Sequence, residues 1–406
     1  MDDFFVVTAP GLEPLAAEEL RRLGLLSDQA STEPARADRH SKSRRTADPH
    51  ESGVTGSGGV AFRSDFTGLY RANLHLRTAS RVLVRLGSFY AAAFPELRKK
   101  ASRLPWERFL QPGQPVALHV TCHKSRLYHS DAVAERVAGA IGDRLKKPSP
   151  MSKAKESQSG DSGEAGQPQL IVVRMVNDLC TISIDTSGEL LHRRGYRQAG
   201  AKAPLRETLA AAMLFASGWD AVSPLLDPFC GSGTIAIEAA LLSLGIPPGI
   251  NRRFQFMDWP GFDPARWEAL LAERPLHPVS MQPRIQASDR DAGAIQSARA
   301  NAARAGVEEF IEFKCLAVSA IQPPPEPGWV VTNPPYGIRV SANKDLRNLY
   351  AQFGNVLRRS CPGWRVAILC SDLALLGQTR LSLDTSFSTL NGGVKVRLAR
   401  GEVDGI

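Results

Sequence analysis

Cysteine is scarce in this sequence, and long apolar runs are missing from it. The 406 residues include 6 cysteines with no C-x-x-C pair, so neither a disulfide framework nor a paired zinc-ligand pattern is indicated. No apolar run approaches the ~20 residues of a membrane-spanning helix. A secretory signal has a basic stretch followed by a long apolar one, and residues 1–7 do not show this pattern. We therefore expect reduced thiols, no membrane partner and a cytoplasmic protein.

Negative charge is in deficit, because 50 Lys and Arg face 41 Asp and Glu and leave a formal net charge of +9. This balance favours a polyanionic partner such as RNA. Hydrophobic residues make up 43% of the chain, which is enough for a sizeable core and excludes a wholly disordered chain.

Large apolar residues are almost missing from two stretches, residues 27–59 and 146–169. Such stretches cannot bury enough surface to offset the entropy of ordering, so we expect two flexible insertions. The first contains a basic run at residues 36–45 that could touch RNA. A solvated insertion without function is the favoured interpretation of that run.

The remaining sequence changes texture near residue 204. Before it, strands and helices of α+β type are expected, with strands at 4–9, 60–63, 81–90, 115–122, 170–176 and 179–185 and helices at 12–23, 66–76 and 130–145. After it, short apolar strands at 224–227, 285–289, 311–314, 328–332 and 366–370 alternate with helices such as 204–215, 234–244, 292–305 and 344–357. This alternation predicts a parallel, Rossmann-like α/β sheet. Asn391, Gly392 and Gly393 predict a terminal hairpin with an antiparallel strand.

The sharpest segment is Asp-Pro-Phe-Cys-Gly-Ser-Gly-Thr at residues 227–234, between a strand and a helix. It is neither a Walker loop nor a G-x-G-x-x-G fingerprint. Gly231 and Gly233 allow a close backbone approach to a ligand, and Asp227 ends the strand. A carboxylate there suits a cationic amino-acid end and a ribose better than a pyrophosphate, as in S-adenosylmethionine (SAM). A tight strand–helix turn is the alternative.

A second carboxylate, Asp289, ends the next strand, where it can accept ribose hydroxyls. Asp289 lies 56 positions after Gly233, more than the ~20 of a simple βαβ unit, so an insertion separates them. The insertion holds Phe254, Phe256, Trp259 and Trp267. These aromatic residues could line a substrate cleft or form the core of an extra subdomain.

Asn-Pro-Pro-Tyr at residues 333–336 follows another strand. An exocyclic amine on a base is a poor nucleophile because its lone pair is delocalised into the ring. The Asn333 side-chain oxygen and the Pro334 carbonyl can accept its hydrogens and orient the lone pair at a methyl group, while Tyr336 offers a face for an extruded base. A strong general base is not required.

Together these two motifs resemble the class I SAM-dependent methyltransferases that modify exocyclic amines. Thr-Ala-Pro-Gly-Leu-Glu at 8–13 and Lys-Ser-Arg-Leu-Tyr-His-Ser at 124–130 resemble a ferredoxin-like segment followed by a THUMP domain. Leu-His-Arg-Arg-Gly-Tyr-Arg at 191–197, leading into 203–212, is similar to the L-type bacterial 23S rRNA guanine-N2 methyltransferases.

The resemblance implies four regions. These are a ferredoxin-like segment at 1–65, a THUMP RNA-binding domain at 66–190, a basic bridge at 191–203 and a methyltransferase domain at 204–406. It implies SAM as co-substrate, held by Asp227, Phe229, Gly231, Gly233, Thr234 and Asp289. It places the target base at Asn333, Pro334 and Tyr336. A tRNA guanine-N2 branch shares every one of these motifs, and a DNA adenine-N6 enzyme shares Asn-Pro-Pro-Tyr.

One position departs from the family pattern. An acidic residue after the third strand usually touches the adenine, whereas Ala317 occupies that place here. This leaves room for weak cofactor affinity, and it motivates a catalytically silent RNA-binding or ribosome-assembly factor as a further alternative.

The remaining candidates concern RNA and metal. Lys124, Arg126, His129 and Arg136 are interpreted as a phosphate-binding face of the THUMP domain, and Arg193, Arg194 and Arg197 as RNA contacts or a solvated basic linker. A zinc site at His119, Cys122, His123 and His129 is disfavoured because no paired Cys/His spacing accompanies them. Cys230 has no triad partners, so we do not expect a nucleophile. The overall expectation is methyl transfer from SAM, without a metal, to guanine N2 in 23S rRNA or in tRNA.

Overall fold

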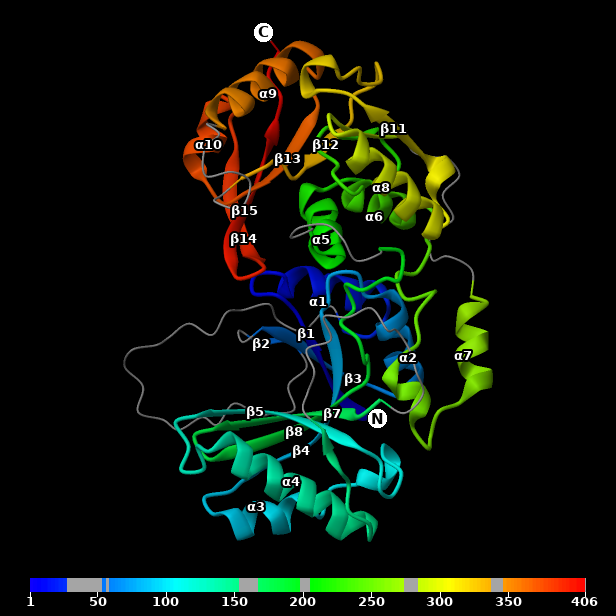
Figure 1. Cartoon of the computed structure of the whole chain (residues 1–406), viewed down its shortest axis with the longest axis vertical. Helices are drawn as coiled ribbons and strands as arrows, with labels where there is room; N and C mark the ends of the chain where they lie inside the picture. Colours follow the sequence, from blue (N-terminus) through cyan, green and yellow to red (C-terminus); the bar gives the residue numbers. More distant parts are fainter. Residues whose placement is uncertain are drawn as a thin grey trace. The chain divides into compact units, whose positions relative to one another are not determined.

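The structure is a computed structural model that describes residues 1–27, 53–55, 58–152, 167–197, 205–273, 284–336 and 346–405. Contacts divide the chain into two units (Figure 1). Unit 1 comprises Met1–Thr8, Ala17–Leu191 and Asn251–Glu273, and unit 2 comprises Ala9–Ala16, His192–Ile250 and Arg274–Ile406. Within the described ranges, no helix has the length and apolarity needed to cross a bilayer.

Unit 1 is built on an eight-stranded sheet with the order β2-β3-β1-β4-β8-β7-β5-β6. Its strands are β1 (Asp2–Val7), β2 (Gly53–Thr55), β3 (Gly59–Ser64), β4 (Arg81–Tyr90), β5 (Val116–His123), β6 (Met151–Ser152), β7 (Gln169–Val176) and β8 (Leu179–Asp185). Its helices are α2 (Phe66–His75), α3 (Phe94–Ala101), α4 (Ser130–Leu145) and α7 (Pro264–Leu271), and α1 (Glu13–Arg22) follows β1.

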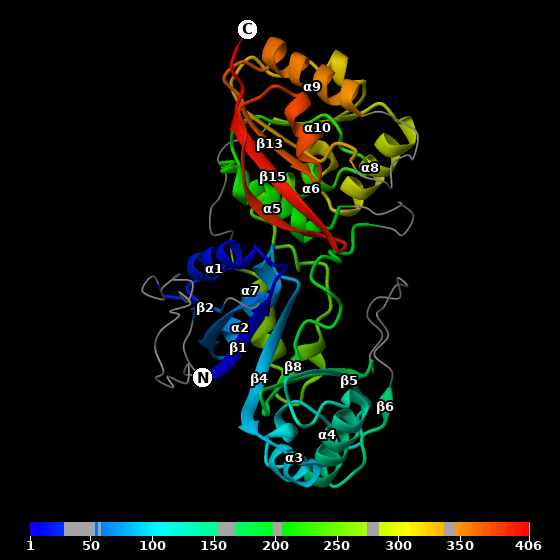
Figure 2. The same cartoon turned by 90° about the vertical axis from the view of Figure 1, so that its left-hand side faces the viewer.

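Strand β4 joins the two halves of this sheet. Arg81–Arg85 pair with β1, and Leu83–Tyr90 pair with β8 across an irregularity between Arg85 and Gly87. Figure 2 shows β4 as one long strand reaching from β1 to β8. The segments resembling a ferredoxin-like fold and a THUMP domain therefore share one continuous sheet.

Backbone pairing extends into both predicted insertions. β2 lies inside residues 27–59 and pairs with β3, and β6 lies inside 146–169 and pairs with β5. The predicted limits are thus too wide, because an edge strand bonds through its backbone and needs few apolar side chains. Residues 28–52 and 153–166, including the basic run at 36–45, lie outside the described residues.

The aromatic residues between α6 and β10 pack into unit 1. Tyr70 of α2 stacks on Phe256 with ring centroids 4.7 Å apart, and Trp259 lies edge-on to Phe109 at 4.9 Å. Trp259 also donates its indole N–H to Gln169 at 2.8 Å. Of the two interpretations left open by the sequence, core packing is right, but the core is that of unit 1 and not that of an extra subdomain, and a substrate cleft lined by these buried rings is wrong.

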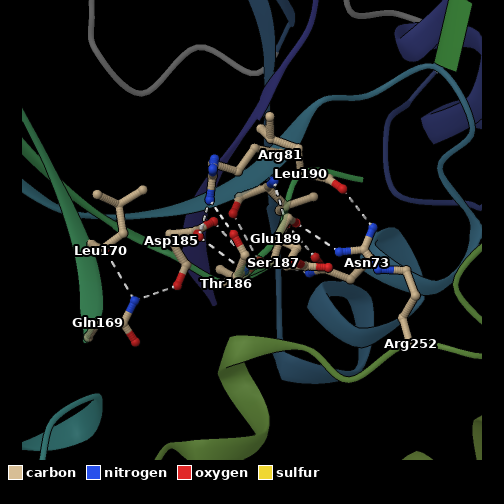
Figure 3. A network of polar contacts seen from close by, with 12 residues as sticks. Asn73, Arg81, Gln169, Leu170, Asp185, Thr186, Ser187, Glu189, Leu190 and Arg252 are labelled. Atoms are coloured by element: carbon tan, nitrogen blue, oxygen red, sulfur yellow. Dashed lines mark hydrogen bonds and ion pairs between the residues drawn. The ribbon is translucent and has the colours of Figure 1, made fainter. Parts of the chain in front are cut away.

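A satisfied polar network lies where the chain leaves β8 (Figure 3). Asp185, which is buried, accepts hydrogen bonds from the Ser187 and Gly188 amides at 3.1 and 3.0 Å and forms an ion pair with Arg81. The Asn73 side chain donates to the Thr186 hydroxyl at 2.8 Å and accepts from the Ser187 hydroxyl at 2.7 Å. Burial raises the pKa of Asp185, and the Arg81 charge opposes that shift.

Unit 2 contains a seven-stranded sheet with the order β11-β10-β9-β12-β13-β15-β14. Its strands are β9 (Leu225–Asp227), β10 (Ile285–Asp289), β11 (Ile311–Cys315), β12 (Trp329–Thr332), β13 (Arg365–Cys370), β14 (Asp384–Asn391) and β15 (Val394–Glu402). The first five are parallel, and the hairpin β14–β15 adds antiparallel strands at one edge (Figures 1 and 2). This sheet confirms the predicted Rossmann-like α/β fold.

Helices cover both faces of this sheet. They are α5 (Glu207–Ser217), α6 (Thr234–Ser243), α8 (Ala292–Arg304), α9 (Arg347–Ser360) and α10 (Leu373–Gln378). Val331 and Ala367 point to the core with α5, α6 and α8, whereas Val330 and Val366 point to the core with α9 and α10. Side chains alternate between the two faces of a sheet, and both faces are covered by helices here. Consecutive residues of these strands are therefore apolar, which explains the continuous hydrophobic runs in the sequence.

Candidate functional site

Three polar residues meet at one edge of the unit 2 sheet. β9 is parallel to β10 on one side and to β12 on the other. The carboxyl ends of these neighbouring strands carry Asp227, Asp289 and, one residue beyond β12, Asn333. In an open α/β sheet this edge is where ligands bind.

Asp227 is a buried carboxylate with one satisfied oxygen. Its Oδ1 accepts from the Thr332 hydroxyl at 2.6 Å and from the Phe229 amide at 3.3 Å. Its Oδ2 is buried and has no hydrogen-bond partner among the described residues. Burial raises the pKa of Asp227 to about 7, against the opposing effect of these two hydrogen bonds. A buried acceptor without a partner is costly, so it indicates a missing donor.

The glycine-rich loop is shaped by its two glycines. Gly231 has φ +51° and open space where a side chain would stand. Gly233 has φ +82°, and a Cβ there would lie 2.9 Å from the Cβ of Ala298. Gly233 precedes the first residue of α6, so the loop ends at a helix amino terminus with free amides. Asp289 Oδ2 accepts a hydrogen bond from the backbone N–H of Gly231 at 3.1 Å.

Asn333 holds the second orphaned acceptor of this edge. Its Oδ1 is buried without a hydrogen-bond partner in the part of the chain that the structure describes. Pro334 is buried beside it, and Tyr350 of α9 donates its hydroxyl to the Pro335 carbonyl at 3.2 Å. Tyr336 accepts from the Asn391 side chain of β14 at 3.1 Å, and burial raises its pKa.

Two flanking loop residues have partners inside unit 2. Phe229 lies edge-on to Phe353 with ring centroids 5.2 Å apart. Thr234 is buried at the start of α6, and its hydroxyl accepts a hydrogen bond from Arg197. Burial also raises the pKa of the Cys230 thiol, which fits the expectation that it is not a nucleophile.

Family models match three parts of the chain. Residues 194–399 match the RMKL-like methyltransferase domain, residues 51–83 the RlmL ferredoxin-like domain and residues 91–156 the THUMP domain. The chain belongs to the RMKL-like methyltransferase family. This confirms the resemblance drawn from the motifs at 227–234 and 333–336.

Relatives of this methyltransferase chain carry RNA-related names. It is 33% identical to a Synechocystis sp. protein named as a candidate RNA methyltransferase, over 98% of this chain and 96% of that protein. It is 32% identical to the ribosomal RNA large subunit methyltransferase K/L of Syntrophotalea carbinolica, over 98% of this chain and 53% of that protein. The chain therefore spans about half the length of the K/L relatives that it matches.

Two solved structures are similar over nearly the whole methyltransferase chain. One, SMU.472, is a candidate methyltransferase complexed with SAH; it is 27% identical, with a TM-score of 0.80 over 100% of this chain and 98% of that one. The other, from Listeria monocytogenes, is named as a predicted N6-adenine-specific DNA methylase. It is 32% identical, with a TM-score of 0.79 over 98% and 95% of the two chains.

The structure disagrees with two of the proposed RNA contacts in the bridge of this methyltransferase. Arg194 is only 4% exposed and lies 3.5 Å from Glu238, and Arg197 lies 3.3 Å from Glu207. Neither the RNA-contact nor the solvated-linker interpretation fits them, because the buried carboxylates of Glu238 and Glu207 hold the two guanidinium groups. Arg193 is half-buried.

Three of the four basic residues predicted on unit 1 are exposed, and the fourth, Arg136, is half-buried with its guanidinium over the Phe94 ring at 5.7 Å. Lys124 and His129 are exposed, and Arg126 pairs with Asp178 at 3.0 Å while its side chain stays 74% exposed. His129 lies against the exposed ring of Tyr128. No group of three or more His, Cys, Asp or Glu side chains arranged for a metal occurs in the described ranges, and His119, Cys122, His123 and His129 do not form one.

Sequence reasoning missed the residues that support this edge. Thr332 holds Asp227, Asn391 holds Tyr336, and Asn301 of α8 donates to the Ser232 carbonyl at 3.0 Å. Thr332 directly precedes the Asn-Pro-Pro-Tyr motif, so its position near the site could have been predicted from the sequence. No local pattern links Asn301 or Asn391 to the loops that they contact.

Proposed function

We propose that unit 2 transfers a methyl group from SAM to the exocyclic N2 amine of a guanine in structured RNA, most simply 23S rRNA. The observation that carries this proposal is a pair of buried acceptors at adjacent strand ends, Asp227 Oδ2 and Asn333 Oδ1, which have no partner among the residues that the structure describes. One is suited to a cationic amino group and the other to a neutral amine.

The residues of the β9–β10 edge fit SAM. Asp227 would hold the ammonium of the methionine end, and the backbone at Gly231 and Gly233 would lie against that end. Asp289 would hold the ribose hydroxyls, with Phe229 and Thr234 flanking the loop. Bound SAM supplies an electrophilic methyl group on a positively charged sulfur. The complex of a structural relative with SAH, the demethylated form of SAM, supports this assignment.

The residues after β12 would present the base. Asn333 Oδ1 and the Pro334 carbonyl accept the two amine hydrogens and direct the nitrogen lone pair, which is a positioning effect. Tyr336 would stack on the base, and its hydroxyl is held by Asn391 at 3.1 Å. Tyr350 fixes the turn between them through the Pro335 carbonyl.

RNA would be held by the exposed basic residues of unit 1. Lys124, Arg126 and His129 offer phosphate contacts, and Arg193 in the bridge is a further candidate. The match to the THUMP model and the rRNA and RNA names of the relatives support an RNA substrate. The name of the Listeria relative makes DNA adenine-N6 the second candidate, since both reactions need an amine held by Asn333.

The test is methylation of naked 23S rRNA, tRNA and duplex DNA with labelled SAM, followed by nucleoside mass spectrometry. We expect N2-methylguanosine in the rRNA and far less of it with Asn333→Ala. N2-methylguanosine in tRNA alone would move the substrate to tRNA, and N6-methyladenine in DNA would favour the second candidate. Transfer to none of the three, with SAH binding intact, would contradict the proposed function.

A further inference from the structure

The bridge of this chain carries two arginines that the proposed function does not use. Arg194 is buried inside unit 2 and Arg197 is half-buried there, and their partners lie on α6 and α5 respectively. Arg197 also donates to the Leu205 carbonyl at 2.9 Å and to the Thr234 hydroxyl. Thr234 is the first residue of α6, directly after the glycine-rich loop. The bridge therefore contacts the point where that loop becomes a helix.

A second chain of contacts reaches the same loop from α8. Asn301 donates its side-chain N–H to the Ser232 carbonyl at 3.0 Å. Arg304 donates to the Asn301 side-chain oxygen and, through Nε, to the Tyr196 carbonyl at 2.7 Å. Asn301 is thus held between the bridge and the loop, and it is only 4% exposed.

The bridge also contacts α6 through Glu238. Tyr196 donates its hydroxyl to Glu238 Oε1 at 3.1 Å, and Arg194 lies 3.5 Å from the same oxygen. Glu238 is on α6, one turn beyond Thr234. We call Tyr196, Arg197, Asn301 and Arg304 the loop latch. Its members come from the bridge and α8, and it holds both the last turn of the loop and the first turn of α6.

We propose that the loop latch positions the glycine-rich loop for the cofactor, with Asn301 and Arg197 as positioning residues. The reason is geometric. Gly231 has a left-handed φ and no atom close to where a side chain would stand, so its hydrogen bond to Asp289 at 3.1 Å is its main contact among the described residues. The Asn301 bond to Ser232 and the Arg197 bond to Thr234 fix the residues on either side of Gly233. A preformed loop binds without first being ordered, which strengthens affinity. This inference rests on the proposed assignment of the loop to SAM.

The test uses a matched pair of Asn→Asp substitutions. Asn301→Asp keeps the acceptor for Arg304 but replaces the donor to Ser232 with a carboxylate oxygen. Asn73→Asp does the same in the network of Figure 3, where Asn73 is also buried and donates to the Leu69 carbonyl at 3.1 Å and to the Thr186 hydroxyl at 2.8 Å. Both changes remove a buried hydrogen-bond donor, the control loses one bond more, and only Asn301→Asp touches the loop.

Two measurements are made on the full-length chain. Hydrogen exchange without ligand should be faster at the loop amides of Cys230 and Gly233 in Asn301→Asp and unchanged there in Asn73→Asp. Calorimetry should show SAH dissociation constants raised about three- to tenfold in Asn301→Asp, the effect of one hydrogen bond, with the Asn73→Asp value equal to that of the unsubstituted chain. In turnover, the Asn301→Asp loss should be in KM for SAM rather than in kcat.

The outcomes separate the two proposals. If the unsubstituted chain binds no SAH, the proposed function fails, while faster loop exchange in Asn301→Asp still supports the latch. If SAH binds and Asn301→Asp leaves both affinity and exchange unchanged, the latch is overturned and the proposed function stands. If Asn301→Asp does not fold, Arg197→Lys takes its place, because it keeps the positive charge beside Glu207. The same changes in hydrogen exchange and SAH affinity are expected for it.

Discussion

Two buried polar regions of this protein differ in one respect. In the unit 1 network of Figure 3, Asp185 and Asn73 have hydrogen-bond partners on every side-chain polar atom. At the carboxyl ends of β9 and β12 in unit 2, Asp227 Oδ2 and Asn333 Oδ1 have no hydrogen-bond partner among the described residues. Because an unpaired buried acceptor costs about 1–3 kcal/mol, the first region stabilises the fold and the second lowers its stability. The second is therefore the region that a ligand would complete.

The largest expected effect separates Asn333 from Asn73. Asn333→Ala should lower methyl transfer by about two to three orders of magnitude, because the amine loses its positioning acceptor. It should leave the melting temperature and SAH affinity almost unchanged, since the lost oxygen has no partner in the described part of the chain. Asn73→Ala should do the reverse and lower the melting temperature while kcat is kept. Turnover assays and calorimetric melts would check this, and a large loss of stability in Asn333→Ala would contradict the comparison.

The next effect separates Asp227 from Asp185. Asp227→Asn keeps an Oδ1 acceptor for Thr332 and removes a poorly solvated charge, so its melting temperature at pH 8 should rise. Its SAH affinity should fall about ten- to a hundredfold with the loss of a charge-assisted hydrogen bond. Asp185→Asn should instead lose about 3 kcal/mol of stability, because Arg81 is left without its carboxylate. If both substitutions shifted the melting temperature in the same direction, the proposed difference between Asp227 and Asp185 would be contradicted.

A smaller effect follows from the raised pKa of Asp227, about 7 without ligand. Since this value exceeds the ordinary 3.8, the folded state binds the proton more tightly than the unfolded chain. The stability that this residue contributes is therefore present below pH 4 and is lost as the pH rises through 7. SAH needs the ionised form, so its affinity should rise by up to about tenfold per pH unit below 7 and level off above it. Asp227→Asn should flatten that profile in calorimetric titrations.

How far the sequence predicts these regions depends on how local their signals are. Asp227 and Asn333 stand in short motifs at strand ends, and β4 and α4 follow apolar periodicity, so all four were predictable. Arg194 and Arg197 were not, because a run of arginines looks solvated until Glu238 and Glu207 are brought beside them. For the aromatic residues of Asn251–Glu273, the sequence allowed packing in an apolar core but did not indicate that this core is in unit 1. Their partner Tyr70 lies far back in the chain.

The smallest effect concerns the carboxyl end of β11. The strand order β11-β10-β9-β12 lines up Ala317, Asp289, Asp227 and Asn333 along one edge. A ligand with its amino acid at Asp227 and its ribose at Asp289 would extend its adenine toward exposed Ala317. Ala317→Asp should place a carboxylate near the adenine amine and raise SAH affinity about three- to tenfold.

The control for Ala317→Asp adds the same charge at a neighbouring exposed residue. Ser319→Asp, in the same turn, should leave SAH affinity unchanged. The deaminated analogue S-inosylhomocysteine should gain nothing from Ala317→Asp, because its ring carries an oxygen where the amine would be. Equal gains for SAH and the analogue would mean that the new charge acts on the ribose or the loop. The adenine would then not lie at the end of β11, and the order of contacts along this edge would have to be redrawn.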